Sequence, residues 1–420
     1  MQRSFIVRPA AMFWGLAVFA PVGVNYLAAV LLLLSLLIVG VAGDWHERVA
    51  RLRASPIFWP VMAYLAWTLV VLALRPHYPQ TGSNLWHGFR IGATMLMAMA
   101  LTRDEALWAL RGFLVMALAS VAMVLLFRSV GFPVIELWRA TLILVGNKSI
   151  NNALLFTVLG ASAAVYGLAH LRNAHGQLGW QALAAFALTG ISAVIVTLWL
   201  PSRTSLLALL IAVVAACVHQ WRKQLRVLAG VLVVAGVIVA ALVWQAPSVQ
   251  QKFELGMQEI EAAQAGAVSE GSWVVRFYMY RDTARMIIDR PVAGWGIGGW
   301  TEQWHLRGPK LLADYNMPHN DFLWMGAQAG LPGALLLLSI LAVGLWHCWR
   351  RDDVAGRYGF AAMLVMLVAT SVNSAMRDAQ IGLSLLWVAM VYLRLAQVPG
   401  AVWQDVVPRR GTPATTVQGN

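Results

Sequence analysis

The chain has 420 residues, of which 60% are hydrophobic and only 12% are charged, and its mean hydropathy is +0.68. This composition excludes an ordinary soluble protein and indicates a chain embedded in a lipid bilayer. The formal net charge is +13, so basic residues outnumber the acidic ones that could neutralise them. The two cysteines, Cys217 and Cys348, lie at the ends of apolar segments and imply no disulfide framework.

Apolar segments recur along nearly the whole chain, and a helix needs about 20 mainly apolar residues to cross a bilayer. The run from Ala28 to Val41 is apolar on every side, whereas the strands of a membrane barrel alternate apolar and polar residues. The predicted fold class is therefore all-α, a polytopic membrane protein with about twelve transmembrane helices. We predict these helices near residues 10–24, 26–43, 57–74, 86–101, 107–127, 150–170, 181–199, 204–219, 227–245, 320–346, 357–374 and 379–396.

The predicted helices divide the chain into four parts. Residues 1–245 hold the first nine helices, residues 246–319 form one long polar loop, and residues 320–396 hold the last three helices. Residues 397–420 are predicted to form a disordered cytoplasmic tail, so that both termini lie inside.

Basic residues favour the cytoplasmic side of membrane proteins, and three basic clusters fall on alternate loops, as this rule requires. Other cations nevertheless fall outside, which suggests an anionic ligand such as a phosphate at the outer surface. The alternative is that several of them anchor to lipid headgroups. The inner clusters are Arg48, Arg51 and Arg53; Arg222, Lys223 and Arg226; and Arg350, Arg351 and Arg357, and the outer cations are Arg128, Arg139, Lys148, Arg203, Arg276, Arg281, Arg285, Arg290, Arg307, Lys310 and Arg377.

Two helices are predicted within the long polar loop. Apolar residues between Val249 and Gln264 recur at the spacing of an amphipathic helix. A second helix is predicted from Ser272 to Asp289, with Arg276, Arg281 and Arg285 among its basic residues. Asp289 follows Arg285 by four positions, so we expect these two residues to form an ion pair.

A glycine-rich run from Gly294 to Gly299 follows Pro291 and spells the pattern GxGxxG. In dinucleotide-binding proteins this pattern follows a strand and opens a helix within a βαβ unit, and no such context exists here. We therefore predict a flexible turn that returns the chain to the membrane.

His319 stands at the outer start of a long apolar segment, within Pro318-His319-Asn320-Asp321. The positive end of a helix dipole disfavours a protonated imidazole, which keeps the ring neutral near a pH of about 7. A neutral histidine there is a candidate general base. The alternative is an interfacial histidine that caps the helix or binds a headgroup.

Arg203 opens another apolar segment on the same side, within Pro201-Ser202-Arg203-Thr204-Ser205. Ser202 is a natural helix cap, whereas an arginine is electrostatically misplaced at a helix amino terminus. An anion bound between the guanidinium and the free backbone N–H groups would remove that repulsion, so we interpret the segment as a phosphate cradle. The alternative is an arginine that extends to the membrane interface.

Two further outer helix starts carry polar residues. Asn147, Lys148 and Asn151 are suited to orient sugar hydroxyls, although amides also cap helices. Arg377 and Asp378 begin the last helix, and they either neutralise each other or place the aspartate beside His319 or an arginine. No metal-binding pattern is found, so arginines would have to supply the electrostatic stabilisation that a metal supplies elsewhere.

Together these residues resemble the bacterial O-antigen ligases, a superfamily that also contains O-antigen polymerases and protein O-oligosaccharyltransferases. The resemblance covers the layout of the chain, including one long loop before the tenth helix, and the helical architecture resembles the GT-C-like glycosyltransferases. The matching motifs are Ser202-Arg203-Thr204, the Arg276 region, and His319-Asn320 followed by Gly330 and Gly333.

The resemblance implies transfer of O-antigen polysaccharide from undecaprenyl pyrophosphate to the lipid A-core oligosaccharide, on the periplasmic side of the bacterial inner membrane. It implies no cofactor, nucleotide or nucleic acid partner. The family's essential basic residues match Arg203 and Arg276, its essential histidine matches His319, and an acidic residue near its last helix matches Asp378. The chain length, without a large soluble region after the last helix, resembles a ligase more than a protein-glycosylating enzyme.

The expected mechanism needs few groups, because a sugar pyrophosphate already carries a good leaving group. We expect Arg203 and Arg276 to clamp the pyrophosphate while His319 removes the proton of the acceptor hydroxyl. Direct attack at the anomeric carbon would invert its configuration, and no carboxylate pair is present to support a covalent glycosyl intermediate. The nearest alternative is an O-antigen polymerase, which uses the same donor. A glycolipid transporter would instead place charges in the middle of its helices, whereas here the charges cluster at outer helix ends, with Arg90 and Arg111 as the main exceptions.

Overall fold

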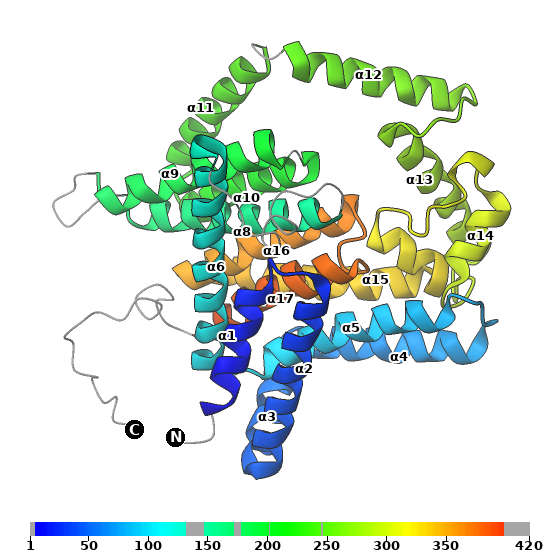
Figure 1. The fold of residues 1–420 in the computed structure, drawn as a ribbon, viewed down its shortest axis with the longest axis horizontal. Helices are drawn as coiled ribbons and strands as arrows, with labels where there is room; N and C mark the ends of the chain where they lie inside the picture. The colour runs from blue at the N-terminus through cyan, green and yellow to red at the C-terminus, as the bar shows by residue number, and fades with distance from the viewer. Residues whose placement is uncertain (1–4, 132–146, 172–177, 201, 245–246, 399–420) are drawn as a thin grey trace.

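A computed structural model describes residues 5–131, 147–171, 178–200, 202–244 and 247–398 (Figure 1). The described chain is helical throughout, which confirms the predicted fold class. The predicted tail beyond residue 398 lies outside the described residues. The helices are α1 (Val7–Ala17), α2 (Val22–Val39), η2 (Gly40–Asp44), α3 (Trp45–Ala54), α4 (Phe58–Leu74), α5 (Thr81–Ala100), α6 (Arg103–Val130), α8 (Asn147–Ala169), α9 (Trp180–Val194), η3 (Ile195–Trp199), α10 (Arg203–Trp221), α11 (Leu225–Trp244), α12 (Pro247–Gln264), α13 (Ser272–Asp289), α14 (Gly299–Arg307), η4 (Lys310–Leu312), α15 (Asp321–Arg350), α16 (Val354–Val372) and α17 (Ala379–Ala396).

Eight helices of the described chain are long and apolar enough to cross a membrane, so the protein is a polytopic membrane protein. Each of the twelve predicted segments overlaps a helix, but several of these helices are too short or too polar to qualify as spans by themselves. The predicted number of about twelve spans remains a prediction. The qualifying helices are α2 with α3, α6, α8, α9 with η3, α10, α15, α16 and α17.

The first predicted segment, residues 10–24, is divided between two helices. Helix α1 ends at Ala17 after 11 residues, and α2 begins at Val22 directly after Pro21. The side-chain amide of Asn25 donates hydrogen bonds to the carbonyl oxygens of Ala17 (2.9 Å) and Ala20 (3.1 Å). A buried amide inside α2 therefore stabilises the turn that interrupts the apolar run.

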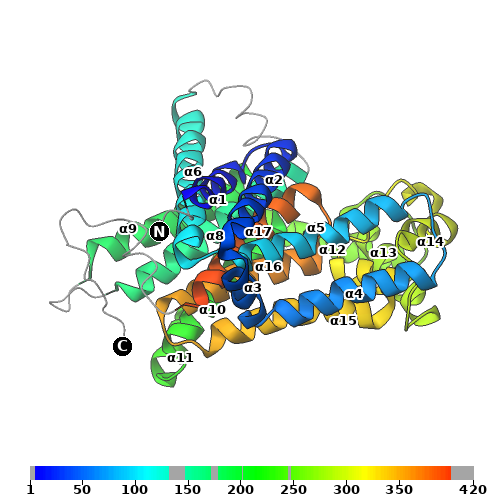
Figure 2. The ribbon, with the colours of Figure 1, turned by 90° about the horizontal axis from the view of Figure 1, so that it is seen from below.

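Helix α17 lies at the centre of the bundle, as both ribbon views show (Figures 1 and 2). Every residue from Gln380 to Ala396 is buried. The helix packs against α2, α5, α6, α8 and α16. The rings of Trp14 and Trp387 stack with their centroids 4.1 Å apart, which fixes α1 to the same core.

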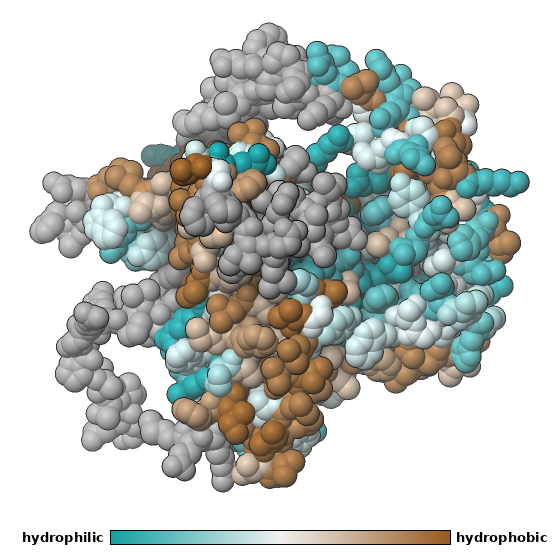
Figure 3. Space-filling model, in the orientation of Figure 1, coloured by the Kyte–Doolittle hydropathy of each residue, from teal (hydrophilic) through white to brown (hydrophobic). Residues whose placement is uncertain are grey.

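The polar segment before α15 forms a separate layer. Helices α12 and α13 occupy the two ranges predicted to be helical, and α13 packs directly on α15. Figure 3 shows hydrophilic residues gathered on the side where α13 and α14 lie in Figure 1. This layer covers the end of α15 at which His319 lies.

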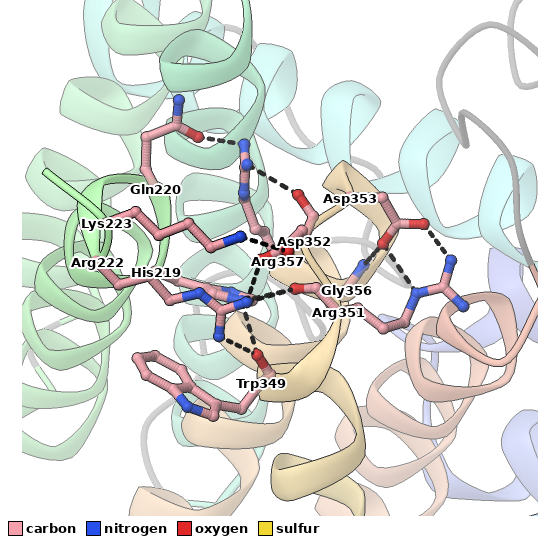
Figure 4. Close-up of polar contacts among 10 residues, drawn as sticks. All are labelled: His219, Gln220, Arg222, Lys223, Trp349, Arg351, Asp352, Asp353, Gly356 and Arg357. Atoms are coloured by element: carbon pink, nitrogen blue, oxygen red, sulfur yellow. Dashed lines mark hydrogen bonds and ion pairs between the residues drawn. The ribbon is translucent and has the colours of Figure 1, made fainter.

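The carboxyl-terminal ends of α10 and α15 meet in a cluster of paired charges (Figure 4). Arg222 and Lys223 both bind Asp352, and the Lys223 Nζ lies 2.8 Å from Oδ2. Arg351 pairs with Asp353, whose carboxylate also caps α16 by accepting the Gly356 N–H at 2.9 Å. We call this set the paired-charge cluster, and it comprises His219, Gln220, Arg222, Lys223, Trp349, Arg351, Asp352, Asp353, Gly356 and Arg357.

Candidate active site

The start of α15 is attached to the connection between α16 and α17. Asn320 is the N-cap of α15: its Oδ1 accepts the Leu323 N–H at 2.9 Å, and its Nδ2 donates to the Ser371 carbonyl at 2.7 Å. Asp321 is fully buried, and its carboxylate accepts the backbone N–H groups of Met376 (2.7 Å) and Arg377 (3.1 Å). These bonds fix the region around His319 to residues that are about fifty positions later in the chain.

Arg90 of α5 binds the carbonyl groups of the same connection between α16 and α17. Its Nη2 donates to the carbonyl oxygens of Met376 and Arg377, both at 2.7 Å, and of Asp378 at 3.1 Å. Asp378 is the N-cap of α17, because its Oδ1 accepts the Ile381 N–H at 2.9 Å. The Asp378 carboxylate therefore has a structural role at α17.

His319 has a left-handed backbone conformation, with φ of 52°, and it is the only non-glycine residue with positive φ in the described chain. Such a conformation is strained for a residue with a side chain, so neighbouring contacts must maintain it. The Tyr280 hydroxyl of α13 donates to the His319 carbonyl at 3.2 Å. The ring of Tyr315 meets the imidazole edge to face, with centroids 6.1 Å apart.

The imidazole of His319 is neutral near neutral pH. Burial, followed by the cations Arg276 and Arg377, lowers its pKa from 6.5 to about 4. The ring precedes the N-cap of α15, and burial together with the two arginines accounts for the lowered pKa. A neutral imidazole can accept a proton, which is the property required of a general base.

The two arginines beside His319 form no salt bridge with any carboxylate of the described chain. The Nε of Arg276 is buried and has no hydrogen-bond partner among the described residues. Arg377 is only 8% exposed, its Nε likewise lacks such a partner, and its guanidinium stands over the Trp324 ring at 6.0 Å. Burial also lowers the pKa of Arg377. Because their charges are not compensated by an ion pair, this pair attracts an anion.

Arg203 begins α10, and Ser202 caps that helix as predicted: its Oγ accepts the Ser205 N–H at 3.2 Å. The Arg203 side chain is exposed and forms no salt bridge within the described residues. The neighbouring Thr204 hydroxyl accepts the Asn373 side-chain amide at 3.3 Å. The amino terminus of α10 therefore lies beside the connection that carries Arg377.

The remaining basic candidates on α13 are paired with an acidic residue. Arg281 binds both carboxylate oxygens of Asp282, at 2.7 and 3.0 Å, and Arg285 lies 3.4 Å from the same carboxylate. The predicted ion pair between Arg285 and Asp289 is wrong, because Asp289 pairs with Arg307 of α14. The chain reverses direction after α13, which brings α14 alongside it.

The amide candidates of α8 lie at its first turns. Asn147 and Lys148 belong to the helix, but their side chains lie outside the described part of the chain. Asn151 is completely buried, and its Nδ2 donates to the Val18 carbonyl at 3.3 Å. This contact joins α8 to the turn between α1 and α2.

One segment of the chain, which contains several of the candidate residues, is similar to a known protein family. A family model described as O-antigen ligase matches residues 187–338, from α9 into α15. This match, which covers about a third of the chain, supports a member of the O-antigen ligase and polymerase superfamily. No curated protein matches the chain. The matched segment includes Arg203, Arg276 and His319, whereas Arg90 and Arg377 lie outside it.

The eight apolar helices fit a multi-pass membrane protein, and the matched family supports a bacterial protein of lipopolysaccharide biosynthesis with a glycosyltransferase-type activity. No group of three or more His, Cys, Asp or Glu side chains that could hold a metal ion occurs in the described ranges. Among the described residues, the charged groups beside His319 are the arginines Arg276 and Arg377.

The glycine run from Gly294 to Gly299 is a packed turn rather than the flexible one predicted from the sequence. The Trp295 and Gly296 N–H groups donate to the carbonyls of Ala327 (2.8 Å) and Gln328 (2.9 Å). These carbonyls are free because α15 is interrupted at Gly330, with φ of 71° and ψ of −178°. A Cβ at Gly330 would lie 2.3 Å from the Val292 carbonyl oxygen, so only glycine fits there.

Three functional candidates were not identified from the sequence, namely Asp321, Arg90 and Tyr280. Asp321 and Arg90 are buried ionisable residues in apolar helices, a class that is costly to bury and therefore a signal in itself. Tyr280 lies four residues after Arg276 and hence on the same face of α13. We define the His319 site as His319, Arg276, Tyr280 and Arg377.

Proposed function

We propose that the protein is an O-antigen ligase, which transfers O-antigen polysaccharide from undecaprenyl pyrophosphate to the lipid A-core oligosaccharide at the periplasmic face of the inner membrane. The observation that carries the proposal is the neutral histidine flanked by Arg276 and Arg377, two cations without carboxylate partners in the described chain. Transfer from a lipid pyrophosphate requires the same two elements, a base and a site for a dianionic leaving group.

The reaction is a direct displacement. The acceptor hydroxyl attacks the anomeric carbon of the donor sugar, and the bond between that carbon and the pyrophosphate oxygen breaks. His319 takes the hydroxyl proton, and the lipid pyrophosphate leaves with the bonding electron pair. A single displacement inverts the anomeric configuration. The resident side chains provide the charge stabilisation, and no step requires a metal ion.

Arg276 and Arg203 bind the pyrophosphate in this proposal, and Arg377 adds a third cation. Arg276 and Arg377 both act electrostatically on His319, so an anion bound there lies close to the base. The Thr204–Asn373 contact supports an Arg203 position at the edge of the same site. A guanidinium presents a planar fork to phosphate oxygens, which suits it to this role better than a lysine.

Reconstitution with purified lipid-linked O-antigen tests the function. The protein is supplied with the donor and with either lipid A-core or a second lipid-linked glycan as acceptor, and the product is identified by mass spectrometry. A glycan joined to lipid A-core supports the ligase. Extension of the lipid-linked glycan instead would identify a polymerase. Absence of transfer to either acceptor, while donor crosses the vesicle membrane, would overturn both in favour of a transporter.

A further inference from the structure

The three residues Met376, Arg377 and Asp378 are held from two sides by charged side chains. The Asp321 carboxylate accepts the N–H groups of Met376 and Arg377. The Arg90 guanidinium donates to the carbonyl oxygens of all three residues, at 2.7 to 3.1 Å. We call this arrangement the backbone clamp. It fixes a connection that is neither helix nor strand.

Both ionisable side chains of the clamp are removed from solvent. Asp321 is 0% and Arg90 4% exposed, and neither forms a salt bridge with a side chain of the described residues. Buried charges inside a membrane protein are unfavourable unless their hydrogen-bonding groups are satisfied. Here backbone groups provide that compensation, so both side chains are committed to the position of one short segment. Apolar packing alone would join the helices without fixing backbone N–H and C=O groups in this way.

The segment also lies unusually close to α17. A Cβ added to Gly382 would lie 2.4 Å from the Met376 carbonyl oxygen and 3.0 Å from Nη2 of Arg90. Only a glycine at that position leaves room for the clamp. Three elements, α5, α15 and α17, therefore contribute to the same small region.

We propose that Asp321 and Arg90 are positioning residues, which fix the backbone of Met376 to Asp378 so that the Arg377 guanidinium stays beside His319. The inference rests on the proposed function of the His319 site. It adds two residues to that site, and neither of them needs to contact the substrate.

Arg377 requires such support because its own side chain, although buried, has few hydrogen bonds. Its Nη1 lies 3.5 Å from the Asn316 Oδ1, a distance at the limit of a hydrogen bond, and its Nε has no partner among the described residues. A guanidinium that is left available for an anion cannot be fixed by an ion pair of its own. Its location must therefore come from the backbone that carries it.

A displaced Arg377 would change the protonation of His319. The groups that face His319 are Arg276 and Tyr280 of α13, Tyr315 of the preceding loop, and Arg377. Of these, the two arginines lower the pKa of His319. Moving Arg377 away removes one of these cations, so the pKa of His319 rises and the acidic limb of the activity profile moves to higher pH.

The first test measures the clamp without any substrate. Hydrogen–deuterium exchange of the purified protein is followed by mass spectrometry in peptides that cover residues 374–381. In Asp321→Asn, which keeps the shape of the side chain, we expect the Met376 and Arg377 amides to exchange about tenfold faster. Arg90→Lys tests the carbonyl side of the clamp. Unchanged exchange in Asp321→Asn would overturn the clamp itself.

The second test measures transfer as a function of pH. Arg377→Gln provides the reference, and we expect Asp321→Asn and Arg90→Lys to reproduce its loss of about a hundredfold and its upward shift of the acidic limb by about one unit. Asp353→Asn is the matched control, because the Asp353 carboxylate also accepts a backbone N–H, but at the far end of α15. We expect this control to retain the acidic limb of the wild-type pH profile.

The outcomes separate the clamp from the proposed function. Faster exchange in Asp321→Asn with an unmoved acidic limb would overturn the positioning role and leave a structural one. Wild-type transfer in Arg377→Gln would overturn both the positioning role and the use of Arg377 in the site. If the wild-type protein transfers no glycan but the exchange results are as expected, the proposed function fails and the clamp remains.

Discussion

The two ends of α15 use arginines in opposite ways. At its end near Arg350, the paired-charge cluster joins α10, α15 and α16 through Arg222, Lys223 and Arg351, each bound to a carboxylate (Figure 4). At its start, Arg276 and Arg377 stand beside a neutral histidine without such partners in the described residues. Carboxylates that neutralise arginines hold helices together, whereas their omission leaves charge available for a ligand.

The comparison is tested most strongly by replacing one histidine at each end. Loss of a general base reduces transfer by about 10²–10⁴-fold, so we expect this effect for His319→Ala, measured with reconstituted donor and acceptor. The matched variant is His219→Ala, whose Nε2 lies 2.9 Å from the Arg351 carbonyl oxygen. His219→Ala should retain transfer per folded molecule. Near-normal transfer by His319→Ala would contradict the assignment of the base.

Replacing an arginine by lysine at each end separates binding from stability. Arg276→Lys keeps the charge but loses the planar fork, so we expect the KM for the lipid-linked donor to rise about tenfold. Arg351→Lys removes a forked contact with Asp353 and should lower the melting temperature without changing this KM. A wild-type KM in Arg276→Lys would show that the arginine does not bind the donor.

The pH dependence follows from the depressed pKa of His319. Transfer should fall only as the pH drops through about 4, because the base is neutral above that value. Removing a cation in Arg276→Gln raises this pKa, so the acidic limb should move upward by about one unit. The free energy of unfolding also falls at low pH. Between pH 6.5 and about 4, His319 is protonated in the unfolded state but not in the folded state, so lowering the pH through this range favours unfolding. An unshifted acidic limb in Arg276→Gln would show that the group whose titration limits transfer is not His319.

The smallest effect is expected for a cap in the paired-charge cluster. Asp353 accepts the Gly356 N–H at the start of α16, and removal of such a cap reduces stability by about 1 kcal/mol. Asp353→Ala should therefore unfold at lower temperature while its rate of transfer stays at the wild-type level. A large loss of transfer in this variant would show that the two ends of α15 are functionally coupled.

The helices were largely predictable because the apolar runs and the spacing of apolar residues reflect local physics. The segments at 249–264 and 272–289 coincide with α12 and α13 for this reason. The end of α1 at Ala17 was not predictable, since it depends on Asn25, an amide within the next apolar run. The break of α15 at Gly330 depends likewise on a distant segment, the turn after Pro291.

The candidate site was predictable only where a residue type and its position at a helix start sufficed, as for His319, Arg203 and Ser202. Asp321 and Arg90 act through backbone groups near Arg377, which are 56 and 287 positions away in the sequence. The ion pairs of Arg285 and Asp289 depend on how α14 folds back. Such partners are determined by tertiary structure, and no local pattern encodes them.

The burial of α17 has a consequence for how the protein is made. This helix fills the centre of the bundle, yet it follows all the other described helices in the chain, and synthesis proceeds from the amino end. The earlier helices are therefore synthesised before the core can be completed, because α17, residues 379–396, is made after them. Arg377 takes its place at the same moment. A nascent or truncated chain that lacks α17 can thus contain His319 and Arg276 and still have no assembled His319 site.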